Sequence, residues 1–89
     1  MNSEKLQITY LRVIADMKPQ MQIIPLKVIF NETEYIIDSV IDIKYQVVMG
    51  LGKQCCAYYC KIKNHLKIIY LDSNFQWFVI KKTSSRNLS

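Results

Sequence analysis

The residues best suited to metal binding or nucleophilic chemistry lie in the second half of the chain, in the pattern Cys55-Cys56-x3-Cys60-x4-His65. Zinc prefers thiolate and imidazole ligands, and a structural site needs four of them in a tetrahedron. On a strand, Cys56 and Cys60 would lie about 13 Å apart, at about 3.3 Å per residue, and Cys55 would face the other way. This spacing disfavours both a shared metal ion and a disulfide. We predict no metal site and no cofactor, with Cys60 as a small buried apolar residue.

Groups for acid–base catalysis are sparse. His65 is the only histidine and lies in an expected turn between lysines, with no acidic residue close in sequence. Asp38 and Asp42 share a strand face but are again about 13 Å apart, which is long even for an inverting carboxylate pair. The chain also lacks a Walker loop, a GxSxG motif and an HExxH motif. We therefore predict that the protein is not an enzyme and that the two aspartates are solvent-facing charges that protect a strand.

Lysines alternate with aromatic residues late in the chain, a pattern typical of small barrels that stack single-stranded bases beside basic side chains. The charge is uneven, with a net of −2 over residues 1–43 and +7 over residues 44–89. On a strand over 55–62, Tyr59 and Lys61 project opposite Cys60, and Lys63 continues the same phase. A nucleic-acid site would use Lys53, Tyr59, Lys61, Lys63 and Lys67. In the alternative interpretation, the aromatic residues form the core and the lysines only solubilise the surface.

The chain must form strands to position these side chains. Hydrophobic residues make up 51% of the chain, and their period-two alternation predicts strands over about 9–17, 23–30, 35–44, 55–62, 66–71 and 75–80. Polar turns are expected at 18–20, 31–34, 63–65 and 72–74. The segment 45–53, with Gly50 and Gly52, is expected to be the one long connection. Pro25 inside the second strand predicts an edge position or a bulge.

A chain of 89 residues is expected to form one domain. We predict an all-β fold of five to six strands, in a strongly bent antiparallel sheet or a small SH3-like or OB-like barrel. Residues 1–8 are expected as an N-terminal extension, either helical, extended or disordered, 9–80 as the barrel, and 81–89 as a flexible basic tail. Alternation and side-chain bulk predict a core made of Leu26, Val28, Ile37, Ile41, Cys60, Ile62 and Trp77.

Five short segments stand out between Ile24 and Val79, namely Ile24-Pro25-Leu26-Lys27-Val28-Ile29-Phe30, Tyr35-x-Ile37-Asp38-x-Val40-x-Asp42, Tyr58-Tyr59-Cys60-Lys61-Ile62, Ile69-Tyr70-Leu71-Asp72 and Trp77-Phe78-Val79. Together they resemble a family of short bacterial proteins of unassigned function. The family has a longer glycine-rich loop where this chain has only Gly50-Leu51-Gly52. The resemblance implies the same strands and carries no activity.

The remaining features bear on location and partners. The apolar runs are cut by Asp38 and Asp72, well short of the roughly 18 residues needed to cross a bilayer, and the first residues do not form a secretory signal. Three cysteines, an odd number, fit a reducing compartment. We therefore expect a cytoplasmic protein that binds no membrane. The favoured function is a non-enzymatic accessory or adaptor module that binds an unidentified protein, for example by strand addition to an open sheet edge. The alternative is a nucleic-acid-binding barrel.

Overall fold

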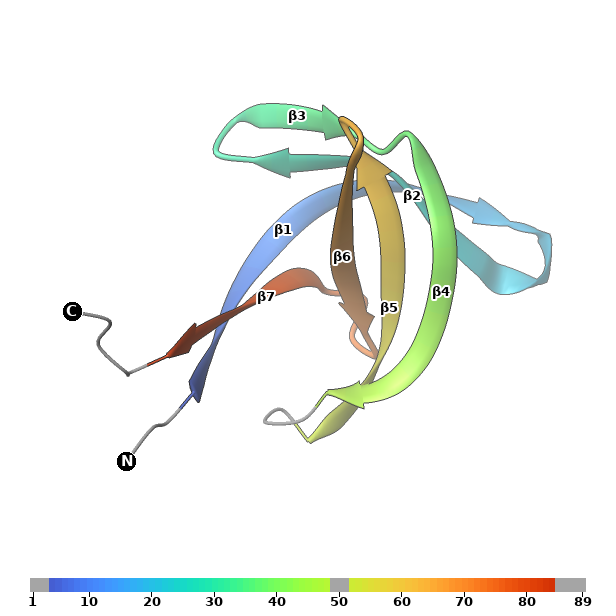
Figure 1. Cartoon of the computed structure of the whole chain (residues 1–89). Helices are drawn as coiled ribbons and strands as arrows, with labels where there is room; N and C mark the ends of the chain where they lie inside the picture. The colour runs from blue at the N-terminus through green and yellow to red at the C-terminus, as the bar shows by residue number, and fades with distance from the viewer. Residues whose placement is uncertain (1–3, 49–51, 85–89) are drawn as a thin grey trace.

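The computed structural model describes residues 4–48 and 52–84 (Figure 1). Its elements are β1 (Glu4–Lys18), the single-turn 3-10 helix η1 (Pro19–Met21), β2 (Gln22–Phe30), β3 (Thr33–Ile36), β4 (Ser39–Val48), β5 (Lys53–Ile62), β6 (His65–Asp72) and β7 (Trp77–Ser84). The strands form one antiparallel sheet in the order β3-β2-β1-β7-β6-β5-β4, strongly curled into a half-barrel. The prediction of an all-β, strongly bent sheet is confirmed, with seven strands instead of five to six. None of the described residues form a helix that could span a membrane.

The extra strand arises because the segment predicted as one strand over 35–44 bends at Ile37-Asp38. Before the bend, β3 pairs with β2, and after it β4 pairs with β5. The Ile37 N–H donates to the carbonyl oxygen of Leu26 (2.9 Å), and the Asp38 N–H donates to that of Lys61 (2.8 Å). The bent segment therefore ties the two ends of the sheet to each other. Beyond it, β4 continues to Val48, so much of the expected connection over 45–53 is strand.

The two outermost parts of the described chain pair with each other. The register of β1 and β7 runs from Glu4↔Ser84 to Leu11↔Trp77. The predicted N-terminal extension and C-terminal tail therefore include strand, at residues 4–8 and 81–84. These two segments pair with each other, and each supplies hydrogen-bonding partners for the other's backbone. Residues 1–3 and 85–89, and Gly50 in the expected connection, lie outside the described residues.

The main apolar cluster fills the inside of the curl. It centres on Tyr58, Ile69 and Trp77, which are 4%, 2% and 9% exposed, and the rings of Tyr58 and Trp77 are 5.1 Å apart. Four predicted core residues are buried, namely Val28, Ile37, Cys60 and Trp77, and Ile62 is half-buried against them. A smaller cluster, around Cys55 and Phe78, is separate from the main one.

Two core predictions are wrong, because Leu26 and Ile41 are 45% and 55% exposed. Each is the extra residue of a β-bulge, since the β1–β2 register skips Leu26 and the β4–β5 register skips Ile41. A bulge adds one residue to one strand and so shifts the alternation of faces after it. Val40 and Ile43 contact the core in place of Ile41. The bulge directly after Pro25 confirms the prediction of an edge position or bulge there.

A matched pair of substitutions tests this placement. Ile69→Ala should lower the free energy of unfolding by about 2–5 kcal/mol, because it leaves a cavity in the main cluster. Ile41→Ala should lower it by about 1 kcal/mol or less, which is the scale of strand propensity alone. Urea titrations followed by the fluorescence of Trp77 measure both values. Equal losses in the two variants would contradict the bulge.

Candidate functional site

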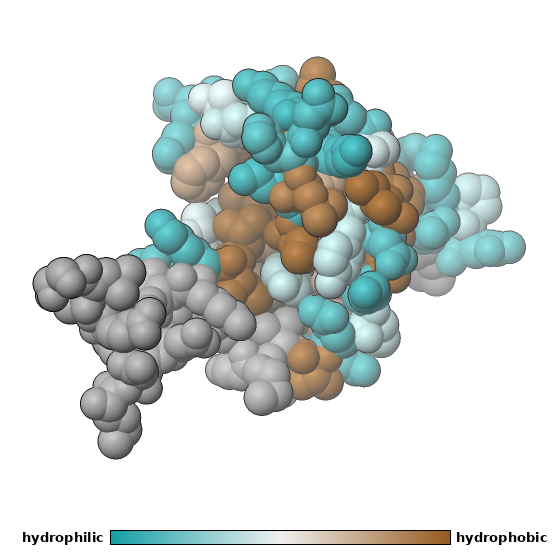
Figure 2. Space-filling view, viewed as in Figure 1, coloured by the Kyte–Doolittle hydropathy of each residue, from teal (hydrophilic) through white to brown (hydrophobic). Residues whose placement is uncertain are grey.

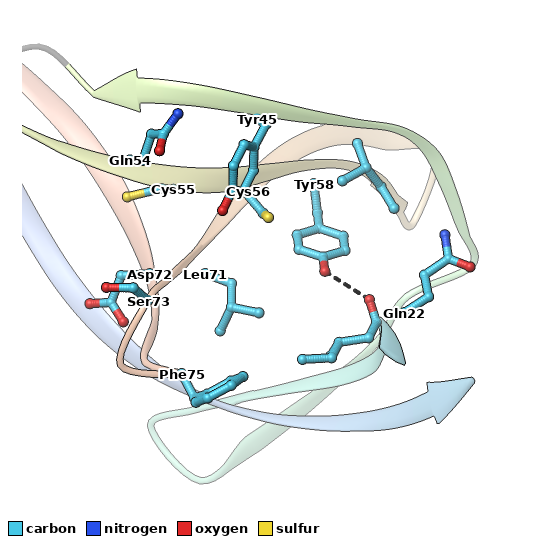
Figure 3. Close-up of a pocket in the computed structure, with 12 residues that line it drawn as sticks. Gln22, Tyr45, Gln54, Cys55, Cys56, Tyr58, Leu71, Asp72, Ser73 and Phe75 are labelled. Carbon is cyan, nitrogen blue, oxygen red and sulfur yellow. Dashed lines mark hydrogen bonds between the residues drawn. The ribbon is translucent and has the colours of Figure 1, made fainter. Parts of the chain in front are cut away.

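A groove lies between two strand edges that no described strand covers. One edge is the first part of β2, which pairs with β1 but not with β3, and the other is β4, which pairs only with β5. The groove has a volume of about 620 Å³ (Figure 3). Ile23 lines it from β2, Ile43 and Tyr45 from β4, and Leu71 from the base. This volume falls within the range of about 300–1,000 Å³ typical of ligand sites.

Tyr58 crosses the base of the groove to the edge of β2. Its hydroxyl donates a hydrogen bond to the carbonyl oxygen of Ile23 at 2.7 Å, drawn as a dashed line in Figure 3. Burial, helped by the nearby thiols of Cys56 and Cys60, raises the pKa of Tyr58 to about 12. The phenol is therefore protonated at neutral pH and remains a donor. The Tyr58 side chain thus satisfies the Ile23 carbonyl on the edge of β2, where no second described strand pairs with it.

On the edge of β4 a side chain also bonds to an open backbone group, but here the backbone is the donor and the side chain is the acceptor. The backbone N–H of Ile43 donates to the Asp42 carboxylate (Oδ1) at 2.9 Å. Open strand edges pair readily with other chains, and charged side chains limit this. On both sides of the groove, therefore, a side chain holds a hydrogen-bonding position that an added strand could take.

Two exposed aromatic side chains flank the groove, Tyr45 from β4 and Phe75 from the turn between β6 and β7 (Figure 3). They are 72% and 70% exposed. Phe75 has a φ of 60°, and its N–H donates to the carbonyl of Asp72 at 3.1 Å. A bulky residue in the left-handed region is strained, and such strain concentrates at functional sites. The left-handed conformation of Phe75 belongs to this turn, which is also closed by the bond from the Asp72 N–H to the carbonyl of Gln76 at 3.0 Å.

Asp72 holds the turn that presents Phe75. Its Oδ1 accepts hydrogen bonds from the backbone N–H groups of Asn74 and Gln76, both at 2.9 Å. Its Oδ2 has no hydrogen bond, but the Lys53 ammonium lies 3.5 Å from it. The Asp72 side chain is only 1% exposed. A buried carboxylate needs such a counter-charge. Lys53, predicted to contact nucleic acid, is therefore engaged in the structure of this turn.

Tyr59 and Lys61, the centre of the predicted nucleic-acid face, lie on β5. Tyr59 is half-buried, and the Lys44 ammonium lies 5.1 Å from the centroid of its ring. One face of the ring is thus in contact with a cation from β4 instead of being free for a base. Lys61 is exposed and lies opposite Ser39 in the β4–β5 register.

The last two predicted residues, Lys63 and Lys67, lie elsewhere. Lys63 belongs to a two-residue turn with Asn64, at φ values of 52° and 65°, and its ammonium lies 5.7 Å from the ring of Tyr35. Lys67 lines a second hollow. The five predicted residues are therefore distributed over the fold, with no single surface that uses all of them, and nucleic-acid binding stays a prediction.

The three thiols are free and differ in exposure. Cys55 and Cys60 are buried in separate clusters, whereas Cys56 is half-buried. Cys55 and Cys56 both line the groove. Burial raises the pKa of all three thiols, that of Cys60 to about 11. Protonated thiols are poor nucleophiles and poor metal ligands at neutral pH. No cluster of three potential ligands, counting His, Cys, Asp and Glu, occurs in residues 4–48 and 52–84.

The chain matches no protein-family model, and no curated protein or solved structure is significantly similar to it. The resemblance to short bacterial proteins therefore stays a prediction.

The hydrogen bond of Tyr58 generates a testable prediction. Tyr58→Phe should lower the free energy of unfolding at pH 7 by about 1–3 kcal/mol, because the Ile23 carbonyl loses its partner. Wild-type stability should also fall as the pH rises from 10 towards 12, since the unfolded phenol ionises before the folded one. This contribution of Tyr58 is complete below pH 10. Tyr58→Phe should show a smaller decline than wild type, since burial also raises the pKa of the three thiols and of Tyr70, and these groups still contribute to the decline.

Urea titrations at several pH values between 8 and 11 measure the effect. Tyr45→Phe is the matched control, because it removes an exposed hydroxyl from the rim of the same groove and should keep the wild-type profile. Identical alkaline profiles for Tyr58→Phe and wild type would count against the assigned bond.

Proposed function

We propose that the protein is a non-enzymatic binding module that takes up an extended segment of a protein partner as an added strand along β4. The observation that carries this proposal is the long open edge of β4 beside an apolar groove. In strand addition, backbone hydrogen bonds provide affinity, and pockets for alternate side chains provide specificity. The free thiols favour a reducing compartment, so we place this interaction in the cytoplasm.

The other end of the sheet is a poorer edge. β3 has four residues, and its Glu34 carboxylate pairs with the Lys27 ammonium at 3.2 Å. Short and charged edges resist pairing. β4 has ten residues and exposes 72% of Tyr45 and 58% of Val47. The contrast in length favours β4 as the receptive edge, because β3 also exposes an apolar side chain, Ile36 at 64%.

The backbone of β4 supports the same assignment. The Ile43 N–H is bonded to a side chain, and strand geometry repeats every two residues. We therefore expect the N–H groups of Tyr45 and Val47 to point to the open side as well. An incoming strand would supply carbonyl acceptors to these groups and would take the position now held by the Asp42 carboxylate.

The two faces of β4 define the chemistry of the partner. Ile43 and Tyr45 line the groove, whereas Lys44 lies on the alternate face, over Tyr59. An added strand would place every second side chain over the groove and the others beside Lys44. Together with the net charge of +5, this favours a segment in which apolar residues alternate with acidic ones.

Strand addition can be tested with a synthetic peptide of about ten residues, the length of β4, that alternates valine with glutamate. We expect fluorescence anisotropy to show saturable binding. The same peptide with every amide N-methylated should not bind, because it lacks the backbone donors on both edges. Bound peptide should also slow the alkylation of Cys56, which lines the groove.

Variants of β4 complete this test. Val47→Pro removes an N–H that we assign to the open side, so it should weaken peptide binding about tenfold or more while keeping the far-ultraviolet circular dichroism of the wild type. Val47→Thr is the control, because it keeps the N–H and the branched shape. Undiminished binding by a folded Val47→Pro variant, or by the methylated peptide, would refute strand addition.

Phe75 links stability to binding in this proposal. Phe75→Asn should raise the free energy of unfolding by about 0.5–1 kcal/mol, because asparagine tolerates the left-handed region, and should weaken peptide binding because an aromatic contact is lost. Phe75→Leu keeps an apolar side chain in the strained conformation, so its stability should remain close to wild type. A Phe75→Asn variant that binds peptide as tightly as wild type would exclude Phe75 from the site.

A further inference from the structure

A second hollow forms where β6 and β7 separate. Within the described residues these strands are paired only at Tyr70↔Phe78 and Leu71↔Trp77, because β6 continues along β5 and β7 continues along β1. Their remaining lengths diverge (Figure 1) and leave a hollow of about 400 Å³. Hydrophobic surface gathers between the β2–β3 hairpin and β7 in Figure 2.

The wall of this hollow is apolar. Leu11, Val28, Ile69 and Val79 contribute to it from four different strands. Val28 and Ile69 are 6% and 2% exposed and form its base, whereas Leu11 and Val79 are half-buried. The hollow is large enough for a small ligand and shares no lining residue with the groove beside β4.

The charges around the hollow all have the same sign. Lys67 and Lys81 are exposed and line it, and no acidic residue among those the structure describes does so. A third ammonium, that of Lys63, lies 5.7 Å from the ring of Tyr35, which also lines the hollow. The ion pairs found in the described part of the chain involve other lysines. Among the residues that the structure describes, Lys67 and Lys81 thus border an apolar cavity with no carboxylate in its lining.

We propose that this hollow is a binding site for a small anionic amphiphile, a medium-chain monocarboxylate. The apolar tail would cover Leu11, Ile69 and Val79, and the carboxylate would lie between Lys67 and Lys81. Charge complementarity selects this class, because a cationic amphiphile would meet like charges and a neutral one would make no ion pair. The site is independent of strand addition at β4.

Decanoate, kept below its micelle concentration, is the probe. In methyl NMR spectra of the intact protein, titration should shift the signals of Leu11, Val28, Ile69 and Val79, while the Ile43 methyl groups in the other groove stay in place. Decylammonium has the same tail length and the opposite charge, so its apparent Kd should be about tenfold weaker or more.

Lysine substitutions assign the head group. The double variant Lys67→Gln and Lys81→Gln should weaken decanoate binding about tenfold, and because both side chains are exposed it should remain folded. Lys61→Gln, an exposed lysine outside the hollow, should leave the affinity unchanged. Equal affinity for the two amphiphiles, equal loss in Lys61→Gln, or shifts at Ile43 instead of Ile69 would overturn the proposal.

Discussion

Two backbone hydrogen bonds, donated by Ile37 and Asp38 to β2 and β5, hold the two ends of the sheet together. The Asp38 carboxylate strengthens the corner, because its Oδ2 accepts the N–H of Lys63 at 3.0 Å. Without this corner the side chains around Tyr58 would form one face of an open sheet instead of an enclosed cluster. Because the corner joins β2 and β4 at one end only, the two strands separate at the other, and the groove is the space between them. Closure and the candidate site are thus consequences of the same bend.

The bulges at Leu26 and Ile41 lie beside this corner, and bulges increase the bend and twist of a strand. The cost is the exposure of two large apolar side chains. Alternation in the sequence locates β1, β2, β5, β6, β7 and four buried core residues, but it merges β3 with β4 and fails at these two bulge positions. An extra residue that is itself apolar leaves the period-two pattern intact, so the shift of faces is invisible. Pro25 is the one local signal of irregularity, and it marks only the first bulge.

The groove was beyond prediction for a different reason. Its two edges lie far apart in the sequence and meet only because the chain bends at the corner, so no local pattern encodes them. Tyr45 falls in a segment expected as a connection. Phe75 falls at the start of the strand predicted over 75–80, whereas β7 begins at Trp77, so no pattern in the sequence marks it as an exposed turn residue. The lysine and aromatic pattern around Tyr59 identified a basic region, but the contact between Lys44 and that ring depends on the pairing of β4 with β5.

The pairing of β1 with β7 has a mechanical consequence. Glu4 lies opposite Ser84 at one end of an antiparallel register that continues to Leu11↔Trp77. A force that pulls these two residues apart acts across the strands, along the direction of the hydrogen bonds, and loads one residue pair at a time. The strands would then separate like a zip at low force, instead of resisting in shear. If Glu4 and Ser84 were tethered to other domains under tension, β1 and β7 would separate first, and the hollow between β6 and β7 would open with them.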